Sequence, residues 1–202
     1  SNFSLLCAAG FIELFNKQRD AVGLSTFTEK LELHTKAGSS RVHINRLYAE
    51  LENLSPMKTL NKKTSTVASL HAIAEQIPKR SLVIIFSDMF QTEEETEIFD
   101  ALRHLKHNKH EVILFHVVDG KQEIAFDFKN RPYLFVDMET GQEVKLHTNQ
   151  VKEAYVSKMK AFNTALKLKC AQYKIDFVTA DINKDFSQVL RPYLLKRTKM
   201  LQ

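Results

Sequence analysis

The sequence predicts an α/β domain of three layers, with helices on both faces of a mostly parallel sheet. Two apolar runs carry this prediction, residues 82–86 and residues 111–118. A run without polar alternation is typical of a strand that is buried on both faces, as in a parallel sheet covered by helices. Segments with apolar residues at helical spacing separate these runs, and strands that each follow a helix favour right-handed β-α-β crossovers.

Length and composition indicate one globular domain, which we expect over residues 3–202. The 44% hydrophobic and 26% charged residues are ordinary values for such a protein. No apolar stretch approaches the roughly 20 residues of a membrane-spanning helix, and the first residues lack the basic segment of a signal peptide. Cys7 and Cys170 have no metal-like spacing and are expected to be free thiols in the core, as suits a reducing compartment. We therefore predict a cytoplasmic protein with no membrane span in this chain.

The formal charge of +5 raises the question of a nucleic-acid partner. The chain has no Gly-x-Gly-x-x-Gly or P-loop pattern that would hold phosphates. Its aromatic residues also do not alternate with basic ones, as a base-stacking platform would require. We therefore predict a solvated basic surface and no nucleic-acid binding.

An antiparallel hairpin is expected near the N-terminus. Residues 3–18 predict a largely buried first helix, and a strand follows at residues 21–27. A short turn leads into residues 31–35, where Leu31 and Leu33 alternate with polar residues. That alternation is typical of an antiparallel edge strand with one face in water.

Two amphipathic helices precede the first apolar run. Residues 44–54 present one apolar face, and Ser55-Pro56 ends this helix. Thr64 or Ser65 is the expected N-cap of the next helix, because hydroxyl oxygens accept hydrogen bonds from the free amides of a first turn. Pro78 ends that helix just before the apolar run.

The C-terminal half continues the alternation of helices and strands. A helix is expected from about Thr92, with glutamates in its first turn that favour the helix dipole. Residues 121–148 contain short alternating runs, which predict a small β-rich insertion with a hairpin. A long helix at residues 150–173, a strand at residues 175–179 and a closing helix complete the predicted order.

Asp88 is the first candidate functional residue, because it stands where the strand of residues 82–86 leaves the sheet. In open α/β sheets, ligands bind at the carboxyl ends of the strands. With Ser87 and Thr64, the Asp88 carboxylate offers the hard oxygen ligands that suit Mg²⁺. The alternative is structural: Asp88 would cap the following turn, and Thr64 or Ser65 would cap a helix.

Three histidines, His104, His107 and His110, resemble a metal-binding tract. No carboxylate or thiol lies at a matching spacing, and the intervening lysines would repel a cation. We therefore expect a solvated helix end, where His and Lys side chains complement the helix dipole.

Asp119 ends the second apolar run and is the remaining acid that could line the same crevice as Asp88. An Asp-Gly pair is also a common turn, so both interpretations stay open. The sequence has no Gly-x-Ser-x-Gly elbow and no identifiable nucleophile with a base, which gives hydrolase chemistry little support.

Several of these segments together resemble one known family. Residues 19–27, 63–70, 80–88, 111–119 and 175–179 occur in the order seen in the bacterial domain-of-unknown-function family 58. The domain of that family is similar to von Willebrand factor type A. The resemblance runs over nearly the whole chain, and it implies a Rossmann-like sheet with a metal-ion-dependent adhesion site at its upper edge.

The resemblance assigns two metal ligands in this chain. Three loops build the site in type A domains, and Thr64 and Asp88 match the Thr of the second loop and the Asp of the third. The first loop, Asp-x-Ser-x-Ser, has no counterpart here, and neither has the strand that carries it. The resemblance therefore implies Mg²⁺ in the complete protein, weak or absent Mg²⁺ binding by this chain, and a start upstream of residue 3.

The absent strand would be the middle one, between residues 21–27 and residues 82–86. Either these two strands pair directly, or another segment fills the position, supplied by a partner or by a second copy through an unpaired strand edge. The resemblance implies a non-catalytic protein-binding module that acts with a MoxR-type AAA+ ATPase or its substrate. The alternatives are a metal-independent scaffold and a metal-dependent enzyme acting on a phosphorylated substrate, with Asp119 as the second acid.

Overall fold

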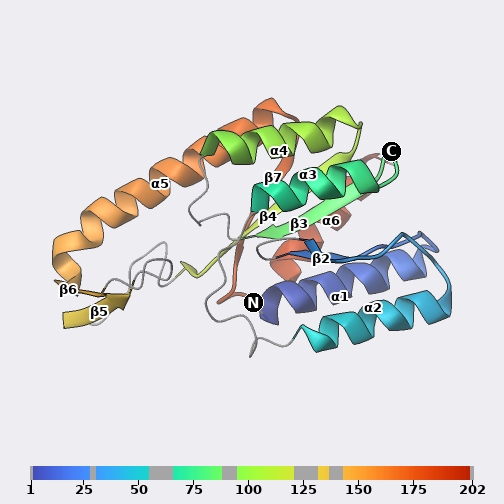
Figure 1. Cartoon of the computed structure of the whole chain (residues 1–202), viewed down its shortest axis with the longest axis horizontal. Coiled ribbons are helices and arrows are strands. Elements are labelled where there is room, and N and C mark those ends of the chain that lie inside the picture. Colours follow the sequence, from blue (N-terminus) through green and yellow to red (C-terminus); the bar gives the residue numbers. More distant parts are fainter. Residues whose placement is uncertain are drawn as a thin grey trace.

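A three-stranded parallel sheet forms the centre of the molecule (Figure 1). The structure, a computed structural model, describes residues 2–27, 31–54, 66–87, 95–120, 132–136 and 143–200. The strands lie in the order β3 (Leu82–Ser87), β4 (Glu111–Val118) and β7 (Asp176–Asp181). Both strand pairs are parallel, as the two apolar runs predicted. The fold is α/β and Rossmann-like.

Helices cover both faces of this sheet and give the three expected layers. On one face lie α3 (Thr66–Gln76), α4 (Glu95–His107) and α5 (Thr148–Gln172). On the other lie α1 (Asn2–Lys17) and α6 (Ser187–Met200), and α2 (Arg41–Asn53) packs against α1. Figure 1 shows this arrangement, with α3 and α4 above the strands and α1, α2 and α6 below them.

The position of the central strand β4 explains why its sequence is an unbroken apolar run. Every residue from Val112 to Val118 is buried. Val112 and Leu114 belong to the core beneath α3, α4 and α5, whereas Ile113 and Phe115 belong to the core beneath α1 and α6. Since successive side chains of a strand point to opposite faces, a strand between two helix layers must be apolar at every position.

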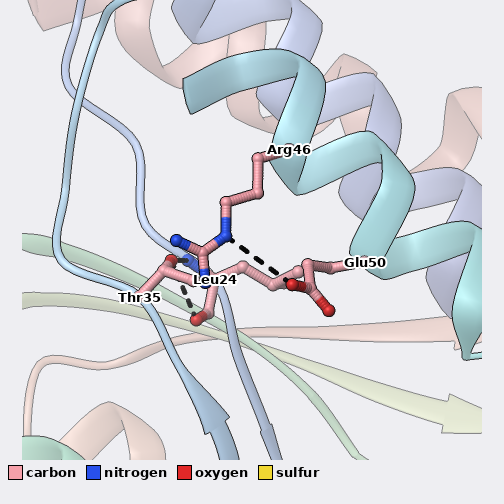
Figure 2. Close-up of polar contacts among 4 residues, drawn as sticks. All are labelled: Leu24, Thr35, Arg46 and Glu50. Carbon is pink, nitrogen blue, oxygen red and sulfur yellow. Dashed lines mark hydrogen bonds and ion pairs between the residues drawn. The ribbon is translucent and has the colours of Figure 1, made fainter. Parts of the chain in front are cut away.

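The N-terminal hairpin forms a separate two-stranded antiparallel sheet of β1 (Ser25–Phe27) and β2 (Leu31–His34). The predicted strand over residues 21–27 was too long, because regular pairing stops at Ser25. Just before it, the Thr35 hydroxyl accepts a hydrogen bond from the Leu24 amide at 2.7 Å and donates one to the Leu24 carbonyl at 3.2 Å (Figure 2). The Thr35 side chain thus replaces part of the strand ladder.

Helix α2 is attached to the base of this hairpin. Ser40 is its N-cap and accepts a hydrogen bond from the His43 amide, and the His43 ring donates to the Val22 carbonyl at 2.8 Å. Within α2, Arg46 Nε lies 3.7 Å from Glu50 Oε1 (Figure 2). The hairpin and α2 therefore form one unit next to α1.

A groove separates this hairpin from the parallel sheet. In the described part of the chain, β1 pairs with β2 and β3 pairs with β4, so the first of the two alternatives, direct pairing of β1 with β3, does not occur. The groove has a volume of about 1230 Å³ and is lined by β1, β3, α1 and α3. The position between residues 21–27 and residues 82–86 therefore stays open among the described residues.

The predicted β insertion is a second antiparallel hairpin, β5 (Pro132–Val136) with β6 (Glu143–His147). It lies at the end of α5 that is remote from the parallel sheet (Figure 1).

Both cysteines are free and buried, as expected, and burial raises the pKa of Cys7 to about 11 and that of Cys170 to about 12. No helix in the described ranges is both long and apolar enough to cross a membrane.

We predict that Thr35→Val destabilises the hairpin by about 1–3 kcal/mol, because the Leu24 amide loses its hydrogen-bond acceptor in a partly buried place. Chemical denaturation of the wild-type and variant chains measures this difference. Thr35→Ser keeps the hydroxyl and is the matched control. Equal stabilities of the Val and Ser variants would show that the hydroxyl contributes nothing.

Candidate functional site

The two predicted metal ligands, Thr64 and Asp88, lie outside the described residues. Their nearest described neighbours are Thr66, where α3 begins, and Ser87, where β3 ends. The Asn108 side chain donates to the Ala74 carbonyl near the end of α3, and the Arg80 amide donates to the Asn108 carbonyl just before β3. The end of α3 therefore lies at the amino edge of the sheet, and α3 runs back from the carboxyl edge.

The carboxyl edge of β4 and β7 carries a polar cluster. Asp119 and Gly120 follow β4, and Asp181 ends β7. The Asn183 side chain donates to Asp119 Oδ1 at 2.7 Å and to Asp181 Oδ1 at 3.1 Å, so it bridges the two carboxylates. A Cβ at Gly120 would collide with the Asp181 carboxylate, so any larger residue there would force this side chain to move.

Asp181 is held in its charged form. Its Oδ1 also accepts hydrogen bonds from the main-chain amides of Gly120 at 3.1 Å and Asn183 at 3.0 Å. Partial burial favours a higher pKa, but the hydrogen bonds from Asn183 and Gly120 outweigh it and lower the pKa of Asp181. The main chain of Asp181 is tied in turn to the Gln188 side chain at the start of α6. Asp181 therefore connects β7 with the end of β4 through its carboxylate and with α6 through its main chain.

The Asp119 carboxylate is accessible but engaged by Asn183, so an acid at this position already has a structural role. Among the described residues, no group of three His, Cys, Asp or Glu side chains could hold a metal ion. Asp119, Asp181 and Asn183 therefore line the part of the carboxyl edge that the structure describes. Thr64 and Asp88 stay predicted metal ligands.

The histidine tract is only partly a solvated helix end. His107 is exposed, as expected, but His110 is buried, and its Nδ1 accepts a hydrogen bond from the Ser81 amide at 3.1 Å. Burial lowers the pKa of His110, which keeps the ring neutral as this acceptor role requires. The solvated interpretation was wrong for His110, because it overlooked that the chain turns directly from this residue into the buried strand β4.

His104 makes a contact that the tract did not suggest. Its Nδ1 lies 2.8 Å from Nδ1 of His71 on α3, and its Nε2 lies 2.8 Å from a carboxylate oxygen of Glu75. The ring centroids lie 5.0 Å apart, and in this hydrogen bond one Nδ1 donates and the other accepts. The pair connects α3 and α4 and does not form a chelate.

Asp181 and Asn183 were missed by sequence reasoning. Asp181 follows an apolar strand as Asp88 does, and this common position was the signal that could have identified it. Asn183 offered no such signal, because only the parallel pairing of β4 with β7 brings it next to Asp119.

Comparison with known proteins identifies the family of this chain. The chain has the fold of an α/β Rossmann-like domain with polar residues at the carboxyl edge of its sheet. It belongs to the family of proteins of unknown function DUF58, whose model matches residues 4–165. No curated protein matches the chain.

Two solved structures are similar. One is the conserved hypothetical protein BatB from Bacteroides thetaiotaomicron, with a TM-score of 0.53, 14% identity, and coverage of 98% of this chain and 88% of that chain. This likeness shows the fold. The other is an uncharacterized membrane spanning protein from Vibrio fischeri, with a TM-score of 0.27, 14% identity, and coverage of 96% of this chain and 84% of that chain.

We predict that Asp181→Asn lowers stability at pH 7 more than at pH 3. Since the pKa of Asp181 is lower in the folded chain, its carboxylate stabilises the fold above the ordinary Asp range of about 4, and this contribution disappears on acidification. Urea denaturation at both pH values measures the difference. Asn183→Ala should reduce the same pH dependence, whereas an equal loss at both pH values would contradict the assignment.

Proposed function

We propose that this chain is a non-catalytic protein-binding module whose contact surface is the carboxyl edge of the sheet. Thr64 and Asp88 would hold a Mg²⁺ ion at this edge, together with ligands from the complete protein. The direction of α3 carries the proposal: its end contacts the amino edge through Ala74 and Asn108, so its beginning, near Thr64, points toward the edge where β3 ends before Asp88.

The chemistry of the donor set supports Mg²⁺. A threonine hydroxyl and a carboxylate are hard oxygen ligands, and Mg²⁺ keeps several waters when the protein supplies only a few. The bound ion would supply a positive charge to which a carboxylate of a partner can bind as a further ligand. The histidines add nothing to such a site, since His104 and His110 are engaged elsewhere.

The expected partner follows from the family resemblance. A domain similar to von Willebrand factor type A, in a family linked with MoxR-type AAA+ ATPases, would bind such an ATPase or its substrate through the metal-containing edge. The Asn183 bridge supports a binding role over catalysis, because it engages the Asp119 carboxylate that an enzyme would need as its second acid.

A metal-independent scaffold is the second candidate, and Asp181 is the observation that favours it. This acid stands at the end of its strand as Asp88 does, and main-chain amides already satisfy one of its oxygens. If Asp88 were held in the same way, its carboxylate would cap a turn and bind no cation.

We predict that Asp88→Ala and Thr64→Ala each weaken Mn²⁺ binding by the complete protein at least about tenfold, because each removes a direct ligand. Electron paramagnetic resonance of free Mn²⁺ gives the affinity, and Mg²⁺ competition confirms the site. Asp176→Ala, at the amino end of β7, is the matched control and should bind like the wild type.

Equal affinity in the wild-type protein and the Asp88 variant would remove Asp88 from the site and favour the scaffold. If a MoxR-type ATPase bound equally strongly in Mg²⁺ and in EDTA, partner binding would not depend on the metal.

A further inference from the structure

The turns that lead into the strands of the parallel sheet lie together at its amino edge. α3, α4 and α5 each end shortly before the strand that follows, which is β3, β4 or β7. α6 starts at the carboxyl edge, and α1 runs in the same direction, because Gly10 lies next to Leu190 and the Phe15 ring next to the Tyr193 ring. Figure 1 shows the ends of α1, α3 and α4 on one side of the molecule, the right side in this view.

The main chain of these turns has an unusual feature. In the described ranges, every non-glycine residue with a positive φ angle is basic: φ is 62° at Arg19, 64° at Arg80, 62° at Lys109 and 56° at Lys174. This left-handed conformation favours glycine. Basic residues that follow a helix also complement its dipole, but the dipole does not require a side chain at the left-handed position itself. Basic residues at all four positions therefore point to a function besides turn formation.

The side chains of these turns give the amino edge an excess of positive charge. Five basic side chains are exposed there and form no ion pair with another described residue: Arg19, Lys79, Arg80, Lys109 and Lys174. The same turns contain three acids, of which Asp20 is exposed and Glu111 and Asp176 are half-buried. A surface with uncompensated positive charge attracts an anionic partner.

α6 brings further basic residues to this edge. From Phe186 onward the chain has no acidic residue and four basic ones, which all belong to α6: Arg191, Lys196, Arg197 and Lys199. Three of these four stand in the last five residues of the helix. The residues before Phe186 contain 25 basic and 24 acidic residues, so α6 accounts for most of the formal charge of +5.

Exposed leucines near the amino edge favour a lipid surface over a nucleic acid. Leu168 is 67% exposed about one turn before the end of α5, and Leu194 is 43% exposed about two turns before the end of α6. Of the large apolar side chains that are exposed in the described ranges, only Phe186 has an aromatic ring, and it lies at the opposite end of α6. Single-stranded nucleic acids need such rings for stacking, whereas basic residues beside leucines suit the surface of an anionic membrane.

We propose that the amino edge of the sheet docks on the surface of an anionic phospholipid membrane. The basic side chains would contact lipid phosphates, and Leu168 and Leu194 would reach the boundary of the acyl chains. About four to eight Lys and Arg residues are a typical cluster for anionic lipids. A second copy of this chain would bring the same positive charge and is a poor occupant. The carboxyl edge with the proposed Mg²⁺ site would face away from the membrane, so this docking does not depend on the metal.

Co-sedimentation of the chain with vesicles tests the proposal. In EDTA, the chain should bind vesicles made of equal parts of phosphatidylcholine and phosphatidylglycerol, and it should not bind vesicles of phosphatidylcholine alone. Raising the salt concentration from about 0.1 M to about 0.5 M should weaken the binding, because the Debye length becomes shorter.

A triple glycine variant separates the charges from the turns. Arg80→Gly, Lys109→Gly and Lys174→Gly together remove three basic side chains and place glycine where the main chain is left-handed. The temperature of thermal unfolding should therefore stay at or above the wild-type value, whereas vesicle binding should weaken at least about tenfold. A matched control removes three exposed basic side chains elsewhere, on α2, on α5 and at the carboxyl edge, and should bind like the wild type: Arg46→Gln, Lys160→Gln and Lys184→Gln.

A tryptophan reporter tests the orientation. Because the chain has no tryptophan, Leu168→Trp and Phe186→Trp each introduce a single one, near the amino edge and the carboxyl edge respectively. Vesicles with phosphatidylglycerol should shift the emission of the Leu168→Trp chain to shorter wavelength and leave that of the Phe186→Trp chain unchanged.

Equal binding of the glycine variant and the wild type would overturn the proposal, as would equal binding to neutral and anionic vesicles or no binding to either. An emission shift at position 186 without one at position 168 would also overturn it. Binding of nucleic acid that the glycine variant loses, without vesicle binding, would assign the amino edge to a nucleic acid instead of a membrane.

Discussion

The burial of β4 on both faces is the constraint on which the rest of the structure depends. A strand whose residues from Val112 to Val118 are all buried needs a strand on each side and a helix layer above and below. β3 and β7 supply the strands, and α3, α4 and α5 face α1 and α6 across them. β3 is apolar as well, but among the described strands it pairs only with β4, so an open groove lies along its other side.

Parallel pairing also determines where the polar residues meet. Because all three strands run in one direction, their carboxyl ends lie at one edge, and Asp119 and Asp181 come together across the Asn183 bridge. Asp88 follows β3 at the same edge in sequence. The groove beside β3 opens near Asp119, so a strand that occupied it would end close to the proposed metal-binding surface. The groove beside β3 and the proposed metal-binding edge would then be neighbouring parts of one surface.

Much of the fold could be predicted from the sequence, because two-sided burial and helical periodicity leave direct patterns. The runs at 82–86 and 111–118 became β3 and β4, and the alternation at Leu31 and Leu33 became the edge strand of a hairpin. The strand at 21–27 was predicted too long, since composition does not reveal that the Thr35 hydroxyl would accept the hydrogen bond of the Leu24 amide in place of a main-chain carbonyl. His110 was misjudged because the ring is buried and its hydrogen-bond donor, the Ser81 amide, is distant in sequence, so no local pattern indicates either feature. The cluster of Asp119, Asp181 and Asn183 could not be predicted, because it forms only when β4 pairs with β7, and no local sequence pattern reveals that pairing.

The most direct test of this account is amide hydrogen exchange along β3 in the free chain, measured residue by residue by nuclear magnetic resonance. The account predicts alternation: the Val83 and Ile85 amides, which face β4, exchange slowly, and the Leu82, Ile84 and Phe86 amides exchange much faster. Uniformly slow exchange at all five amides would contradict it, because the outer side of β3 would then already be paired.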